Sequence, residues 1–238
     1  MGQWLLTLEA RAKINLALDV LFRRPDGYHE VSMVLQSIAL ADRISFAETE
    51  EISVETNIAD LDCGPANLAF RAAAMLQNKF SVRRGVRIRL EKEIPLAAGL
   101  AGGSTDAATV LRGLNSLWGL ELSSGELAAL GAALGSDVPF CLQGGTMLAT
   151  GRGEVLDPLP AMPHTWIVLA KPPLAVSTAW VYGNYRSDRV AVHPDIAGMK
   201  ACLSVGDSSG VAARLANVLE TVTAAVHSEI DVLKRAML

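Results

Sequence analysis

Alternating apolar and polar residues occupy several stretches of the chain, and this period of two predicts β-strands. The alternation runs through 4–20 and returns at 31–38, 42–55 and 86–90. A short, uninterrupted apolar run at 166–170 has the length of one further strand.

Helical spacing of apolar residues marks a second set of segments. In the first of them, Leu68, Ala72, Met75 and Leu76 share one face. Helices are predicted over 67–80, 105–118, 124–134 (with Ser124 as a candidate N-cap), 212–226 and 229–237. Strands and helices are mixed without the regular alternation of a doubly wound sheet, so we expect an α+β fold.

Three prolines within 158–163 indicate a stiff connector, which predicts domains at 1–157 and 158–238. Half of the 238 residues are hydrophobic and 19% are charged, as in well-packed globular proteins. The net charge of -4 argues against nucleic acid or a membrane surface as a partner. No apolar run approaches the roughly 18 residues that a membrane span needs.

The cysteines Cys63, Cys141 and Cys202 are odd in number and widely spaced, without a C-x-x-C pair. This argues against a disulfide framework or a zinc site and favours a reducing compartment. The first fifteen residues carry charges and lack a cleavage site typical of a signal peptide, so a cytoplasmic protein is expected. No heptad or apolar stripe indicates an oligomeric state.

The strongest local signal is the glycine-rich segment 94–106, which follows a predicted strand and opens a predicted helix. Small residues let the backbone approach an anion, and the helix N-terminus presents unpaired N–H groups there. Ser104 and Thr105 offer hydroxyls to a phosphate or to a phosphate-bound cation. The spacing is neither that of a Walker loop nor that of the dinucleotide fingerprint. A tight strand-to-helix turn with Ser104 as N-cap is the alternative interpretation.

A lysine and an aspartate are the candidate catalytic pair. Lys13 lies in a strand pattern with Asn15 on the same face, and Asp137 follows a predicted helix. An aspartate beside a lysine could accept a proton from an attacking hydroxyl, while the lysine stabilises negative charge. The alternatives are an N-cap role for Asp137 ahead of Pro139 and a surface role for Lys13.

Taken together and in this order, the segments resemble the GHMP kinase superfamily from about Ala10 onward. The resemblance rests on the segments 12–16, 24–30, 95–104, 135–140 and 177–179. The Asp-Gly-Tyr-His element at 26–29 resembles the branch that phosphorylates a cytidylated methylerythritol in the non-mevalonate isoprenoid pathway. A homoserine or mevalonate-type kinase is the alternative within the superfamily.

The resemblance implies a two-domain fold with the active site in a cleft between the domains. It also implies transfer of the γ-phosphoryl group of ATP, with Mg²⁺, to the 2-hydroxyl of this small-molecule substrate. Asp137 matches the general base and Lys13 its partner, and the metal ligands are left open. Matching substrate-binding residues are Asn15, Tyr28, His29, Thr178 and Tyr182. Matching ATP-binding residues are Pro95, Ala97, Ala98, Gly99, Leu100, Ala101, Gly102, Gly103, Ser104 and Thr105.

Family members carry a third glycine-rich motif after their last long helix. The sequence up to Leu238 contains no such motif. This difference leaves a second possibility, a catalytically impaired or truncated homologue that still binds nucleotide.

Overall fold

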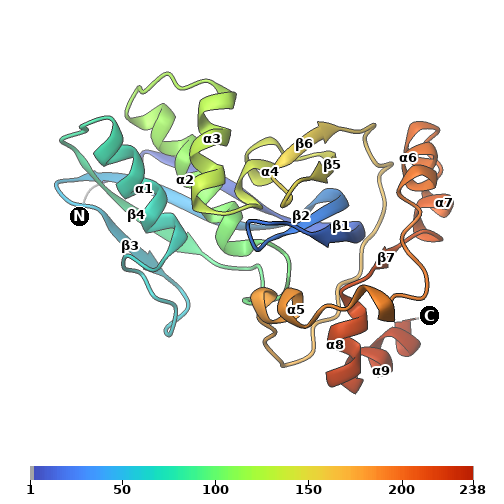
Figure 1. Ribbon diagram of the computed structural model, residues 1–238. Coiled ribbons are helices and arrows are strands. Elements are labelled where there is room, and N and C mark those ends of the chain that lie inside the picture. The colour runs from blue at the N-terminus through green and yellow to red at the C-terminus, as the bar shows by residue number, and fades with distance from the viewer. Residues whose placement is uncertain (1–2, 238) are drawn as a thin grey trace. The chain divides into compact units, whose positions relative to one another are not determined.

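The computed structural model describes residues 3–237, so Leu238 lies outside the described part (Figure 1). The chain forms two compact units built from interleaved segments. The first unit comprises Met1–Lys13, Ser37–Pro95 and Leu100–Gly144, and the second comprises Ile14–Gln36, Leu96–Gly99 and Gly145–Leu238. The sequence predicted two consecutive domains with a boundary between residues 157 and 158. That boundary stays a prediction.

Two long strands contribute a part to each unit: β1 (Leu6–Arg23) and β2 (His29–Thr49). In the first unit, the end of β2 pairs antiparallel with β4 (Gly85–Glu91), from Arg43 opposite Glu91 onward. Strand β3 (Ser53–Thr56) pairs parallel with the other edge of β4.

Four helices complete the first unit: α1 (Leu68–Lys79), α2 (Gly102–Leu117), α3 (Ser124–Leu134) and α4 (Val138–Gln143). Helix α2 packs against the other three, and α1 to α3 lie together in Figure 1. They bury a common core with the strands, whose largest members include Phe46, Leu76, Ile88, Leu111 and Leu114.

The second unit contains the remaining strands. Strand β5 (Thr146–Thr150) pairs antiparallel with the beginning of β2 and with β6 (Val155–Pro158). The short β7 (Ala216–Asn217) pairs parallel with β1.

Short helices make up the rest of the second unit. They are α5 (Thr178–Asn184), the 3-10 turn η1 (Ser187–Arg189), α6 (Ile196–Ser204), α7 (Ser208–Ala212), α8 (Glu220–Val226) and α9 (Ser228–Met237). Leu16 and Val34 pack there against Met199, Leu203 and Val211. Within residues 3–237, no helix has both the length and the apolar character to cross a membrane.

The expected α+β class is confirmed, whereas three local expectations are wrong. The apolar run 166–170 forms no strand, and Trp166 is 91% exposed. A strand needs a neighbour for its hydrogen bonds, which apolar composition alone does not supply. The helix expected over 212–226 is interrupted by β7, and Ser123 rather than Ser124 caps α3 through a capping box with Glu126.

One glycine lets α2 approach the sheet. A Cβ added to Gly113 would lie 2.6 Å from the ring of Phe46. Gly125 in α3, by contrast, has open space around it.

We predict that Gly113→Ala lowers the free energy of unfolding by about 1–3 kcal/mol, because the new methyl group overpacks a rigid core. Gly125→Ala should raise it slightly, since alanine favours helix and meets nothing there. Urea titration of both variants gives the comparison. Equal free energies of unfolding for the two variants would contradict the close approach of Gly113 to the ring of Phe46.

A buried ion cluster of Asp42, Lys92 and Asp106 lies where β2, β4 and α2 meet. Lys92 Nζ contacts Asp42 Oδ2 and lies 2.5 Å from Asp106 Oδ2. All three side chains are at most 4% exposed. Burial, outweighing the attraction of Lys92, raises the pKa of Asp106 to about 7.

This raised pKa predicts a pH-dependent stability. The folded protein keeps a proton on Asp106 that the unfolded chain, with a model value of 3.8, has already released. This contribution to stability is therefore complete below about pH 4 and is lost as the pH rises through about 7.

Urea titrations from pH 5 to 8 should show wild type losing stability relative to Asp106→Asn. The slope should not exceed about 1.4 kcal/mol per pH unit, the value for one proton. A difference that does not change with pH would mean that Asp106 has no raised pKa.

Candidate active site

The glycine-rich loop ends in the uncapped N-terminus of α2. Ala101 occupies the N-cap position with φ 59°, and its side chain makes no capping bond. The first intrahelical bond runs from Thr105 N–H to the Ala101 carbonyl. The amides of Gly102, Gly103 and Ser104 therefore precede the helical hydrogen-bond ladder, and together they suit an anion.

The loop backbone is held in a costly conformation. Ala97 (φ 50°) and Ala101 (φ 59°) adopt left-handed backbone angles, as does Gly99 (φ 72°). Each such alanine costs of order 1–3 kcal/mol, which persists only where the surroundings impose it. Such strain is typical of ligand-binding loops.

The two hydroxyls after the loop differ in their surroundings. Thr105 is buried, and its hydroxyl donates to the Arg11 carbonyl at 2.8 Å. Ser104 is half-buried and lies inside α2, so the alternative of Ser104 as N-cap is wrong. Ser104 is the more accessible hydroxyl of the two.

Lys13 and Asp137 meet inside the first unit. Lys13 Nζ lies 3.8 Å from Asp137 Oδ2. Lys13 is only 6% exposed, so the surface-lysine alternative is wrong. Asp137 occupies the N-cap position of α4 without a side-chain capping bond. Its carboxylate is therefore directed to the lysine rather than to the helix it precedes.

The same unit brings this pair to the second half of the loop. The backbone N–H of Lys13 donates to the Leu100 carbonyl at 3.1 Å. A Cβ on Gly135 would lie 4.0 Å from Ser104 Oγ, so the turn before Asp137 adjoins the first turn of α2. An ammonium, a carboxylate and a helix N-terminus thus lie together.

Cys141 follows Asp137 by one helical turn, and its thiol is unreactive. Burial, and then the charge of Asp137, raises the pKa of Cys141 to about 12. The thiol therefore stays protonated at neutral pH.

A second group of candidate residues lies in the second unit, around the turn 24–28. The turn is tight: Gly27 has φ 87°, and Asp26 Oδ1 accepts from the Tyr28 N–H at 3.1 Å. Arg24 pairs with Glu30 at 2.6 Å, and Glu30 in turn accepts from the Gly151 N–H. These bonds attach the turn to Gly151, the residue that follows β5.

Aromatic rings gather at the end of this turn. His29 stacks on Tyr182 with ring centroids 5.4 Å apart. The ring centroid of Tyr185 lies 6.2 Å from that of His29, with the two ring planes at 84°. Burial, with a smaller effect of Arg23, lowers the pKa of His29. The imidazole is therefore neutral at neutral pH, with one donor and one acceptor nitrogen.

The remaining predicted substrate residues lie in the same unit. Tyr28 is 54% exposed, and the Arg152 guanidinium lies 4.9 Å from its ring centroid. Thr178 is exposed at the start of α5, and Asn15 is half-buried on β1. Their roles as substrate contacts stay predictions.

Sequence reasoning missed Tyr185, Arg152 and the ion cluster. Tyr185 follows Tyr182 by three residues, a helical spacing that could have indicated it. Arg152 and Lys92 had no such signal, because their partners lie far away in the sequence. Within residues 3–237, no group of three or more His, Cys, Asp or Glu side chains could hold a metal ion.

Comparison with known proteins identifies the family. Residues 67–145 match the model of the GHMP kinases N terminal domain. The 4-diphosphocytidyl-2-C-methyl-D-erythritol kinase of Geobacillus kaustophilus is 51% identical over 237 residues, covering 98% of this chain and 81% of the relative. The enzyme of the same name from Bacillus cytotoxicus is 50% identical over 234 residues, with the same coverage of both chains.

Solved structures agree with this assignment. A crystal structure of 4-(cytidine 5'-diphospho)-2C-methyl-D-erythritol kinase superposes with a TM-score of 0.77 at 35% identity, covering 96% of this chain and 81% of that one. Streptococcus pneumoniae phosphomevalonate kinase shares the fold alone, with a TM-score of 0.61 at 11% identity, covering 91% of this chain and 78% of that one. The chain therefore belongs to the 4-diphosphocytidyl-2-C-methyl-D-erythritol kinase family of GHMP kinases.

Proposed function

We propose that this protein transfers the γ-phosphoryl group of ATP to the 2-hydroxyl of 4-diphosphocytidyl-2-C-methyl-D-erythritol, in the non-mevalonate isoprenoid pathway. The observation that carries the proposal is the pair of the buried Lys13 and the partly exposed Asp137, beside the uncapped N-terminus of α2. Phosphoryl transfer depends mainly on positioning and on charge stabilisation, and this arrangement offers both.

Asp137 is the proposed general base. Its carboxylate accepts the proton of the substrate hydroxyl as that oxygen bonds to the γ-phosphorus. The bond from the γ-phosphorus to the bridging oxygen breaks, and ADP leaves. Lys13 stabilises the negative charge near the attacking oxygen.

The loop is the proposed ATP-binding element. The amides of Gly102, Gly103 and Ser104 would hold phosphate oxygens, and the small residues before them leave room for close approach. Mg²⁺ would neutralise phosphate charge. Because the described residues form no acidic metal cluster, we expect phosphates and water to supply most of its ligands, with Ser104 as a candidate.

The aromatic group of the second unit is the proposed recognition element for the cytosine. Tyr28 and Tyr182 offer ring faces, and the neutral His29 offers both a donor and an acceptor to a pyrimidine.

Cys63, Cys141 and Cys202 are free thiols, which fits the expected cytoplasmic location.

The decisive assay is turnover of the cytidylated substrate with ATP, compared with homoserine and mevalonate. We expect turnover of the cytidylated alcohol alone. Preference for either of the other alcohols would overturn the substrate assignment, and tight ATP binding without any turnover would favour an impaired homologue.

We predict that Asp137→Asn lowers kcat by about 10²–10⁴-fold, the usual contribution of a positioned general base. Its melting temperature should change little, because asparagine has the same size and keeps an oxygen that can accept from Lys13. Asp157→Asn, which removes an exposed carboxylate, is the matched control. Equal kcat in both variants would exclude Asp137 as the base.

Tyr182→Ala should raise KM for the cytidylated substrate about 10-fold or more, since stacking of a base on an aromatic ring is worth about 1–3 kcal/mol. KM for ATP should stay within about twofold. Trp180→Ala, with an exposed ring on the same helix, controls for loss of any aromatic side chain. A parallel rise of both KM values would argue against a role in pyrimidine recognition.

A further inference from the structure

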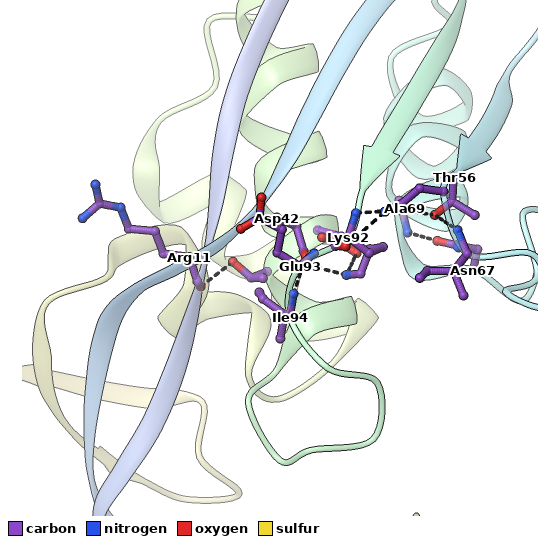
Figure 2. Close-up of polar contacts among 12 residues, drawn as sticks. Arg11, Asp42, Thr56, Asn67, Ala69, Lys92, Glu93 and Ile94 are labelled. Carbon is purple, nitrogen blue, oxygen red and sulfur yellow. Dashed lines mark hydrogen bonds and ion pairs between the residues drawn. The ribbon is translucent and has the colours of Figure 1, made fainter. Parts of the chain in front are cut away.

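The ion cluster of Asp42, Lys92 and Asp106 joins the two ends of the glycine-rich loop. Figure 2 shows two of its members, Asp42 and Lys92. Lys92 directly follows β4 and leads into the loop, whereas Asp106 lies in α2, just beyond it. Their side chains meet at 2.5 Å although 14 residues separate them in the sequence. The pair therefore closes the loop at its base.

The incoming end of the loop is fixed by several bonds. Asp42 Oδ1 accepts from the backbone N–H groups of Glu93 at 2.6 Å and Ile94 at 2.8 Å. The Asn57 side chain bonds both the N–H and the carbonyl of Lys92. Figure 2 shows Asp42, Lys92, Glu93 and Ile94 gathered at this point.

The outgoing end of the loop lies close to the incoming end at Gly102, where a side chain would press on Ile94. A Cβ at Gly102 would lie 3.5 Å from Lys92 Nζ and 3.2 Å from Ile94 Cγ2. The next turn of α2 is joined to β1, where Thr105 donates to the Arg11 carbonyl, two residues before Lys13. A continuous set of contacts thus leads from the cluster through α2 to the strand of the candidate catalytic lysine.

We propose that Lys92, held between Asp42 and Asp106, is a positioning residue that presets the phosphate loop and the N-terminus of α2 for a nucleotide triphosphate. This proposal rests on the proposed function, because it assigns the loop to ATP. Asp106 Oδ1 is buried and lacks a hydrogen-bond partner within residues 3–237. An unpaired buried oxygen costs free energy of folding, so stability alone does not explain this cluster. The loop alanines with left-handed angles need such an external constraint.

The test compares three variants. Asp106→Leu removes the partner of Lys92, Asp106→Asn keeps an oxygen that accepts from it, and Leu76→Ala destabilises the same core from α1. ATP affinity is measured by calorimetry at a temperature where each variant is folded. Amide hydrogen exchange of residues 97–105 is measured without ligand.

We expect Asp106→Leu to weaken ATP binding about tenfold or more and to speed exchange in the loop, as loss of a charge-assisted bond implies. KM for ATP should rise, while KM for the cytidylated alcohol stays unchanged. Asp106→Asn should remain within about twofold of wild type in both measurements. Leu76→Ala should lower the melting temperature without altering ATP affinity or loop exchange.

Unchanged ATP affinity and loop exchange in a folded, destabilised Asp106→Leu would overturn the proposal, because the cluster would then only stabilise the fold. If this variant does not fold, Lys92→Gln replaces it with the same expectations, and failure of both to fold also counts against a positioning role. Absence of ATP binding by wild type would instead refute the proposed function. In that case, amide hydrogen exchange of residues 97–105 without ligand would still show whether Asp106→Leu loosens the loop.

Discussion

A buried ammonium group must be neutralised, and this requirement organises the first unit. Lys92 is removed from water, and the fold brings the side chains of Asp42 and Asp106 to it. Asp42 lies on β2 and Asp106 on α2, so one lysine fixes the meeting point of two strands and a helix. The same contacts fix where β4 ends and where α2 begins. The residues between those two points are confined to a short loop.

This confinement makes the loop suitable for an anion. Its alanines adopt left-handed angles, and three amides at the start of α2 point out of the helix without a capping side chain. A site whose donors are already aligned loses little free energy on binding. Lys13 and Asp137 lie beside the same helix end, so the charge that would develop in the proposed phosphoryl transfer would meet groups already in place.

The second unit holds the aromatic rings of His29, Tyr182 and Tyr185 at defined angles to one another. The turn before His29 is held by Arg24, Asp26 and Glu30, so the histidine has a defined position against Tyr182. Tyr185 supports the histidine from its edge, and its hydroxyl donates to the Val20 carbonyl. Partial burial favours the neutral imidazole, which keeps one donor and one acceptor nitrogen for the proposed recognition of a pyrimidine.

Short-range patterns in the sequence determined much of this protein. Periodicity indicated α1, α2, α3 and the main strands, and the family resemblance of short motifs pointed to Lys13, Asp137 and the loop. These features depend on neighbours within a few residues, so one sequence can carry them. Tertiary structure alone decided that Lys92 pairs with Asp42, 50 residues away, and that Arg152 lies over Tyr28. It also decided that 166–170 is not a strand. The physical reason is that burial, ion pairing and strand pairing all need a partner, and the chain supplies that partner only after it has folded.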